Sequence, residues 1–347
     1  LIGALIGDAA GGPVEFQPAQ RGPWTATDAV LSAEGRAALA AAFRLRPYTT
    51  DAAPYAQWED QAPPGTVTDD SRFKVLFFEA LARAEGTLPD RATFAQVVLD
   101  AHADTTGPHA ALRRAWLDEF AYAARWVLGE RDEGARPPAR AWGGIPTMAG
   151  QMPFLPIAAL HPGDPEAAYR AVWALDFLDN GIARDLNAAL VAGLAAALDD
   201  GATWARIEAA MRATDPFGFG EVPWVPRRLD GWLDVAHAAV AEAEGRPARL
   251  YAALERDLQA ETWWDAWVPM VVVFACVELA QHDPLAAMQL VLEFGYDTDS
   301  YLQVVGAFVG ALHGPEVFPA PMRATVEAHL ERAHGVTLAE WLTLLRR

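Results

Sequence analysis

Close to its C-terminal end the chain reads Glu293-Phe-Gly-Tyr-Asp-Thr-Asp-Ser-Tyr-Leu-Gln-Val-Val-Gly-Ala-Phe-Val-Gly-Ala-Leu-His-Gly314. Asp297, Asp299 and Ser300 place two carboxylates and one hydroxyl within four residues, at the start of a predicted helix. Oxygen donors at this density suit a hard cation such as Mg²⁺, Mn²⁺ or Ca²⁺. Aspartate and serine are also favoured N-cap residues, which accept hydrogen bonds from free N–H groups. Taken alone, this stretch is equally compatible with a cation site and with simple helix capping.

The helix that follows is rich in small residues. They stand at Gly306, Ala307, Gly310 and Ala311, where bulkier side chains would keep neighbouring backbones apart. We therefore predict a buried helix in this region that packs closely against its neighbours.

A second acidic cluster favours the cation. The segment Gly65-Thr-Val-Thr-Asp-Asp-Ser71 precedes residues 72–83, whose apolar positions recur at helical spacing. Thr68, Asp69 and Asp70 thus also stand at a helix N-terminus. One residue suffices to cap a helix, and adjacent like charges repel each other unless a cation lies between them. We predict that both clusters contribute to a metal site.

The N-terminal residues 1–16 add two further carboxylates. They form a predicted helix of small residues that ends at Gly11-Gly12-Pro13, a strong stop signal. Asp8 lies inside the apolar helix, where a carboxylate is costly unless it is paired, hydrogen-bonded or bound to a metal. We interpret Asp8 as a hydrogen-bond acceptor for backbone N–H groups or as a substrate contact. Glu15 follows the break and is freer to act as a metal ligand.

Composition narrows the class of protein. The 347 residues are 52% hydrophobic, which is ample for one large core, and the formal net charge is −19. A non-specific grip on nucleic acid or on an anionic membrane is therefore not expected. The single cysteine, Cys276, excludes an intramolecular disulfide framework and a cysteine zinc finger. No apolar run reaches the length of a membrane span, and we expect a cytoplasmic monomer with one domain over residues 1–347.

Alanine and leucine dominate the long segments, which favours helices over strands. We predict an all-α fold, although Val271-Val-Val-Phe also resembles a strand. The predicted helices cover residues 1–16, 27–45, 72–83, 91–103, 108–128, 166–177, 183–198, 232–244, 248–258, 267–279, 284–294, 302–312, 321–333 and 338–345.

An irregular segment over residues 129–156 contains a candidate ligand wall. Trp142, Gly143 and Gly144 combine an aromatic ring with two glycines, and two methionines follow. This composition suits contact with a flat ligand, so we predict that these three residues bind substrate. Packing between parts of the chain explains the same residues nearly as well.

Three motifs together resemble the ADP-ribosylglycohydrolase family, which includes dinitrogenase reductase-activating glycohydrolase and the ADP-ribosyl-acceptor hydrolases. They are Gly3-Ala-Leu-Ile-Gly-Asp-Ala-Ala-Gly-Gly-Pro-Val-Glu15, Gly65-Thr-Val-Thr-Asp-Asp-Ser71, and Gly295-Tyr-Asp-Thr-Asp-Ser300 with Gly306-Ala-Phe-Val-Gly-Ala-Leu-His-Gly314. The motifs occur in the family's order and span nearly the whole chain. The resemblance implies an orthogonal multi-helix bundle with a binuclear Mg²⁺ or Mn²⁺ centre at one end.

The resemblance also implies roles for individual residues. One ion would be held by Thr68, Asp69, Asp70 and Asp299. The other would be held by Asp297, Asp299 and Ser300 with Glu15 nearby, so that Asp299 bridges the two. The implied reaction is hydrolysis of an ADP-ribosyl N- or O-glycosidic bond in a modified protein or a small conjugate. Either Asp69 or Glu15 would then accept the proton from the attacking water.

Two departures from the family pattern concern the substrate pocket. Many members carry an Asn-Gly…Met-Arg loop, whereas the nearest match here, Gly150-Gln-Met-Pro153, lacks the arginine. A histidine common in the family is missing from Ala174-Leu-Asp-Phe-Leu-Asp-Asn-Gly181. We therefore predict weaker dependence on the substrate's diphosphate, unless Arg72, Arg227 or Arg228 replaces the missing arginine.

Other functions remain open. One is an N-glycoside hydrolase of the same family that acts on a free ADP-ribosyl or nucleoside-like metabolite. Another is a non-catalytic ligand-binding or structural relative. An HD-type phosphohydrolase is suggested by His282-Asp283, but Pro284 makes this dipeptide a helix N-cap, and no clustered histidines accompany it.

Overall fold

The computed structural model describes residues 1–17, 19–48, 62–107, 109–129, 146–179, 181–224 and 226–346. Within these ranges the chain forms 16 α-helices and no strand, apart from one isolated bridge between Thr147 and Asp265. The all-α prediction is confirmed. Among the described helices, none combines the length and the apolar character that crossing a membrane requires.

The α-helices are α1 (Ile2–Gly11), α2 (Ala33–Ala42), α3 (Asp69–Arg83), α4 (Arg91–Ala103), α5 (Ala110–Leu128), α6 (Gln151–Phe154), α7 (Pro165–Leu175), α8 (Gly181–Ala197), α9 (Trp204–Ala213), α10 (Leu229–Ala243), α11 (Pro247–Asp257), α12 (Val268–Leu279), α13 (Pro284–Phe294), α14 (Thr298–His313), α15 (Ala320–His334) and α16 (Leu338–Leu345). Short 3₁₀ helices are η1 (Gly12–Val14), η4 (Leu155–Leu160), η5 (Phe219–Glu221) and η6 (Pro315–Val317).

Most helix boundaries match the prediction within a few residues, but one predicted helix starts late and two helices, α6 and α9, were not predicted. The predicted helix 27–45 begins only at Ala33, because the Ser32 side chain accepts a hydrogen bond from Gly35 N and caps the helix there. Helix α9 was not predicted; the side chain of Thr203 caps its start. The stretch that includes Val271 is part of α12 and is buried almost all round. Its uniform burial removes the amphipathic spacing that identifies a surface helix.

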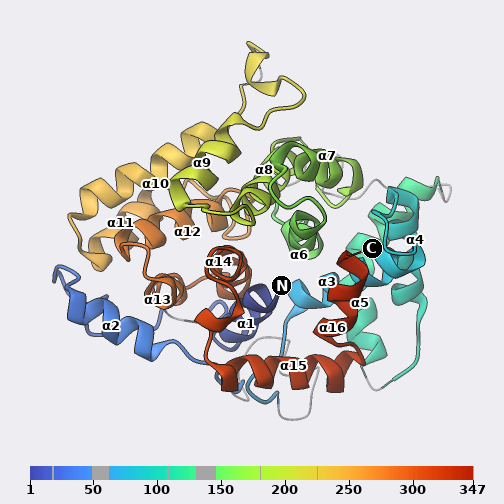
Figure 1. Cartoon of the computed structure of the whole chain (residues 1–347), viewed down its shortest axis with the longest axis horizontal. Helices are drawn as coiled ribbons and strands as arrows, with labels where there is room; N and C mark the ends of the chain where they lie inside the picture. Colours follow the sequence, from blue (N-terminus) through green and yellow to red (C-terminus); the bar gives the residue numbers. More distant parts are fainter. Residues whose placement is uncertain are drawn as a thin grey trace.

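Helices α1 and α14 form the centre of the molecule (Figure 1). Their backbones touch where glycines face the partner helix. A Cβ atom added at Gly3 would lie 2.0 Å from the Gly306 carbonyl oxygen, and one at Gly7 would lie 1.9 Å from the Leu302 carbonyl oxygen. Only glycine allows this approach. It confirms the close packing that the small residues of α14 predict.

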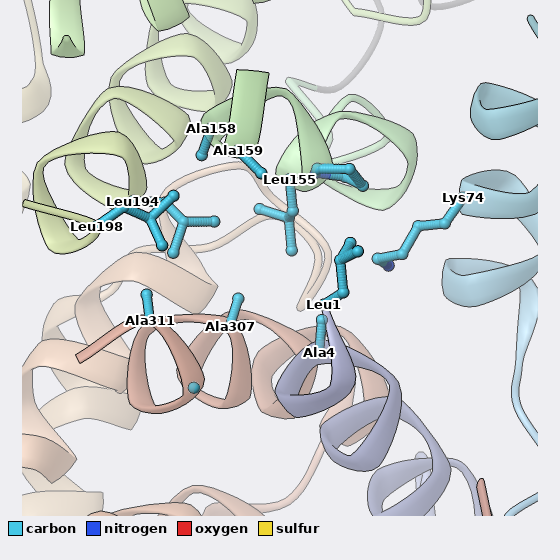
Figure 2. Close-up of a pocket in the computed structure, with 12 residues that line it drawn as sticks. Leu1, Ala4, Lys74, Leu155, Ala158, Ala159, Leu194, Leu198, Ala307 and Ala311 are labelled. Atoms are coloured by element: carbon cyan, nitrogen blue, oxygen red, sulfur yellow. The ribbon is translucent and has the colours of Figure 1, made fainter. Parts of the chain in front are cut away.

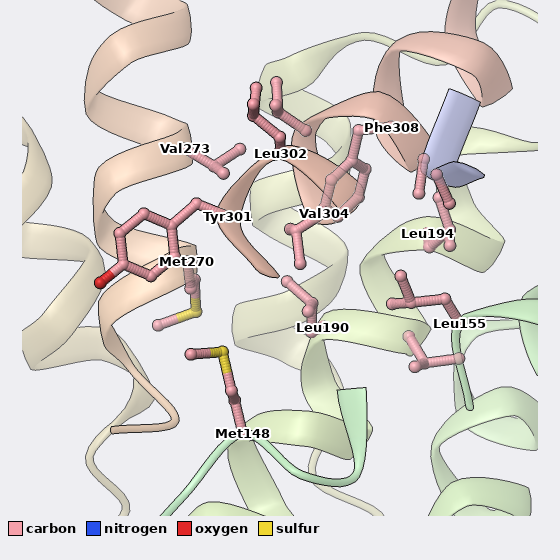
Figure 3. Packing of buried hydrophobic residues seen from close by; sticks show 14 of the residues in the cluster. Met148, Leu155, Leu190, Leu194, Met270, Val273, Tyr301, Leu302, Val304 and Phe308 are labelled. Carbon is pink, nitrogen blue, oxygen red and sulfur yellow. The ribbon is translucent and has the colours of Figure 1, made fainter. Parts of the chain in front are cut away.

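Helix α14 is also the middle of the hydrophobic core. Figure 3 shows Tyr301, Val304 and Phe308 packed among side chains of α8, α12 and the 148–155 segment. Met148 and Met270 meet on one side of this cluster (Figure 3). These apolar contacts fix α14 along its length and so hold the polar residues of its first turn in place.

A buried polar network holds the segment that leads into α6. Asp179 accepts hydrogen bonds from Thr147 Oγ1 (2.5 Å), Gly150 N (2.8 Å) and Asn187 Nδ2 (3.1 Å). Asp176 accepts from the backbone N–H groups of residues 178 and 179. Burial, together with the neighbouring carboxylate of Asp179, raises the pKa of Asp176 to about 7. The network anchors residues 147–151 to α8.

We predict that Gly7→Ala destabilises the protein by about 1–3 kcal/mol or more, because the added methyl group overlaps the α14 backbone. Gly231→Ala is the matched control, since Gly231 lies exposed in α10 with no atom within 4 Å of an added Cβ. The control is expected to stabilise the protein by roughly 0.5–1 kcal/mol through helix propensity. Urea unfolding of both variants measures the difference. Equal effects would show that α1 and α14 are not in backbone contact.

A second prediction concerns pH. Asp176 has a pKa of about 3.9 in an unfolded chain, so its raised native pKa favours folding fully below that value and less as pH rises towards 7. The free energy of unfolding falls by up to about 1.4 kcal/mol per pH unit from this group in that range. Asp176→Asn is expected to flatten the decline, whereas Asn at the exposed Asp200 leaves it unchanged. Urea unfolding between pH 5 and pH 8 gives the slopes, and identical slopes for all three proteins contradict the assignment.

Candidate metal centre

Three helix ends meet beside the α1–α14 contact. A Cβ atom at Gly11, the last residue of α1, would lie 2.5 Å from the Asp299 Cα atom in the first turn of α14. Thr298 Oγ1 donates a hydrogen bond to the Gly11 carbonyl oxygen (2.9 Å), which joins the two ends. Asp8 joins the start of α3 to α1, because its carboxylate accepts from Thr68 N (3.0 Å) and Ser71 N (3.1 Å).

Glu15, Asp297 and Asp299 form the acidic core of this meeting point. Each offers a carboxylate oxygen, and these oxygens all lie within 4.8 Å of one another. The three residues are buried, with exposed fractions of 8%, 6% and 1%. Glu15 Oε2 and Asp299 Oδ1 are buried oxygens that accept no hydrogen bond from any described residue. Buried carboxylate oxygens without donors are costly, so this arrangement requires a proton or a cation.

The second predicted cluster lies against the first. Ser300 Oγ donates to Asp70 Oδ2 (2.9 Å), which links the N-terminus of α14 to that of α3. Thr68 is fully buried; it caps α3, and its hydroxyl donates to Asp8 Oδ1 (2.6 Å). Asp69 is only half-buried, and its Oδ2 accepts from the indole Nε1 of Trp116 (3.2 Å). The Ser300–Asp70 bond thus places the two predicted clusters side by side, whereas the Asp69 side chain hydrogen-bonds to Trp116 and to none of the other six predicted ligands.

The cluster is electrostatically strained without a cation. Burial, followed by the carboxylates of Asp299 and Asp297, raises the pKa of Glu15 well above its usual range. Burial and the neighbouring carboxylates act in the same way on Asp299, and the pKa of Asp70 is raised by burial and by Asp299. Burial raises the pKa of Asp297 to about 7. A divalent cation would offset the repulsion among the carboxylates, because it carries the opposite charge. It would also offset the burial of unpartnered oxygens, because it binds them directly.

The donor set fits a hard cation. Carboxylate and hydroxyl oxygens are the ligands that Mg²⁺ and Mn²⁺ prefer, and the described residues of the cluster include no sulfur or imidazole donor. The two unpartnered oxygens of Glu15 and Asp299 are the observation that supports this fit.

The predicted substrate contacts have different outcomes. Trp142, Gly143 and Gly144 lie outside the described residues. Asp8 is fully buried and has the hydrogen bonds to backbone N–H groups that the first of its two interpretations predicts. Arg227, suggested as a replacement for the missing arginine, instead pairs with Asp185 at 3.1 Å, and its side chain is 7% exposed.

Several residues of the centre were not foreseen from the sequence. Trp116 lies within the predicted helix 108–128 and was given no functional role, although its indole N–H donates to Asp69 Oδ2. Tyr48 is buried with a hydroxyl that has no partner among the described residues, and a Cβ at Gly12 would lie 2.0 Å from this oxygen. Lys74 donates to the Asp70 carbonyl oxygen, and Gln303 donates to the Asp70 carboxylate. The only signal in the sequence for any of these contacts was Lys74, a charged residue among apolar residues of α3.

Comparisons with known proteins agree with this geometry. The sequence profile of the ADP-ribosylglycohydrolase family matches residues 1–347. A solved structure described as an "ADP-ribosylglycohydrolase-related protein complex" is similar with a TM-score of 0.52 at 17% identity, over 99% of this chain and 95% of that chain. At this identity the structural likeness shows the fold alone. No curated protein matches the sequence.

Proposed function

Because the chain belongs to the ADP-ribosylglycohydrolase family, we propose that it is a metal-dependent hydrolase that cleaves an ADP-ribosyl N- or O-glycosidic bond. The observation that carries the proposal is the buried group of Glu15, Asp297 and Asp299, with free oxygens on two of its three members. Capping does not explain these residues, since no side-chain capping bond is found at the start of α14.

We assign the metal ligands from the same contacts. Glu15, Asp297 and Asp299 would hold one divalent cation, and Thr68, Asp69, Asp70 and Ser300 extend the site towards α3. When bound, Mg²⁺ or Mn²⁺ supplies positive charge for the ribose hydroxyls and lowers the pKa of a water molecule. Cleavage of the glycosidic bond also requires an acceptor for the proton of the attacking water.

Asp69 is our choice for this proton acceptor. It is the half-buried carboxylate of the group, whereas Glu15 is buried within the acidic core. The Trp116 indole donates to one oxygen of Asp69 and so orients its carboxylate. Among the described residues, no donor bonds to the other carboxylate oxygen of Asp69.

The substrate is proposed to be an ADP-ribosylated protein or a small ADP-ribosyl conjugate. The segment in which many family members have arginine here contains Gly150 and Gln151, which are held by Asp179, Asn187 and the Ala266 carbonyl oxygen. No described residue of this segment carries positive charge, since residues 146–154 contain neither lysine nor arginine. This favours a substrate whose diphosphate contributes little to binding, including a free nucleoside-like metabolite.

We predict that Asp299→Asn abolishes binding of divalent cations, because Asp299 lies at the centre of the acidic core. Asp283→Asn is the matched control: Asp283 caps α13 by accepting from Ala286 N (2.9 Å), and asparagine retains this cap. Titration calorimetry with Mg²⁺ or Mn²⁺ measures stoichiometry in both variants. Undiminished binding to the Asp299 variant would remove this residue from the ligand set.

A further prediction separates Asp69 from Glu15. Asp69→Asn is expected to lower kcat by about 10²–10⁴-fold while the cation at Glu15, Asp297 and Asp299 remains bound. Glu15→Gln is expected to weaken cation binding itself. Metal content and single-turnover rates on an ADP-ribosyl conjugate distinguish the two. Full activity of the Asp69 variant rules out its role as proton acceptor.

The substrate class is tested by competition. ADP-ribose and a phosphate-free ribose analogue are titrated against the metal-loaded enzyme while it hydrolyses an ADP-ribosyl conjugate. We expect inhibition constants of the two compounds to lie within about tenfold of each other, because the residue that grips a diphosphate bidentately is missing. Strongly phosphate-dependent inhibition would contradict the divergent pocket and favour a conventional ADP-ribosyl hydrolase.

A further inference from the structure

Lys74 is a fully buried charged side chain directly behind the proposed metal centre. It lies in α3, one turn after Asp70, and is 1% exposed. Figure 2 shows its side chain extending from α3 towards Leu1 at the start of α1, at the edge of an apolar cavity of about 90 Å³. Burying an ammonium group is costly, so its partners indicate what it stabilises.

The partners of Lys74 lead to Asp70. Its Nζ atom donates to the Asp70 carbonyl oxygen (3.0 Å) and to Gln303 Oε1. Because an ammonium group only donates hydrogen bonds, the Gln303 amide must turn its oxygen to Lys74 and its NH₂ group away. The NH₂ group then donates to Asp70 Oδ1, while Ser300 Oγ donates to Asp70 Oδ2. The Asp70 carboxylate is thus held at both oxygens.

The two sides of the centre differ in charge as a result. Glu15, Asp297 and Asp299 form a group of three carboxylates with free oxygens on Glu15 and Asp299. Asp70 has a lysine ammonium next to its own backbone, and both of its carboxylate oxygens already accept hydrogen bonds. A second cation on the Asp70 side would be repelled by Lys74 and would compete with two donors.

We propose that Lys74 acts as a resident cation that makes the two sides of the centre unequal. The side formed by Glu15, Asp297 and Asp299 binds a divalent cation first, and the side of Thr68, Asp69 and Asp70 binds a second one much more weakly. The inference rests on the proposed metal-dependent function. It assigns to Lys74, which Gln303 links to Asp70, the role of setting the difference in cation affinity between the two sides, without contact with substrate.

Titration of the purified full chain with Mn²⁺, followed by the electron paramagnetic resonance signal of free Mn²⁺, tests the inference without an activity assay. For the native sequence we expect two steps whose dissociation constants differ by at least about tenfold. Lys74→Met is expected to tighten the second step by about tenfold or more and to leave the first within about threefold, since only the nearby charge is removed. Lys74→Arg, which keeps the charge, should retain the weak second step. Gln303→Leu, which frees Asp70 Oδ1 but keeps Lys74, should tighten the second step less than Lys74→Met does.

The outcomes separate the inference from the proposed function. Two equal steps in the native chain, or a second step that Lys74→Met leaves unchanged or weakens, overturn the role of Lys74 while the metal centre stands. Absence of any Mn²⁺ binding overturns the metal-dependent function and this inference with it. If Lys74→Met does not fold, two equal steps in the native chain still overturn the proposal, and so does a Lys74→Arg variant that loses the weak second step.

Discussion

The contact between the α1 and α14 backbones is the constraint on which the rest of the structure depends. Gly3, Gly7 and Gly306 lie where any side chain would meet a carbonyl group of the partner helix. This contact brings Glu15 from one end of the chain to Asp297 and Asp299 near the other. Dispersion attraction is lost when packed atoms separate, so the close contact of the two backbones holds the helices in one relative position. The positions of the carboxylates at the ends of these helices are fixed with them.

The acidic cluster opposes folding, and the surrounding helices compensate for only part of this cost. Helices α3 and α14 both begin at the cluster, with acidic residues in their first turns. The partial positive charge at a helix N-terminus favours carboxylates there. The pKa of Asp299 and of Asp70 nevertheless stays well above the usual range, chiefly because of burial. A divalent cation bound at this cluster would therefore stabilise the folded state as well as serve the proposed reaction.

Much of the fold and the core of the candidate site could be predicted from the sequence, because both depend on local patterns. Helical spacing and the Asp-Thr-Asp-Ser and Thr-Asp-Asp-Ser motifs identified the elements and the carboxylates. The pairing of Lys74 with Gln303 could not be predicted, since 229 positions separate them and only tertiary packing joins them. Trp116 shows a related difficulty: an aromatic residue on an apolar face reads as core even when its polar edge contacts Asp69.

The network of Asp176, Asp179 and Asn187 attaches residues 147–151 to α8 through bonds that involve none of the carboxylates of the acidic core. The polar bonds that hold this segment are therefore separate from those of the acidic core, although Met148 packs in the same hydrophobic core as α14. If this segment contacts substrate, as proposed, changes in it would alter recognition without removing a hydrogen bond of the acidic core.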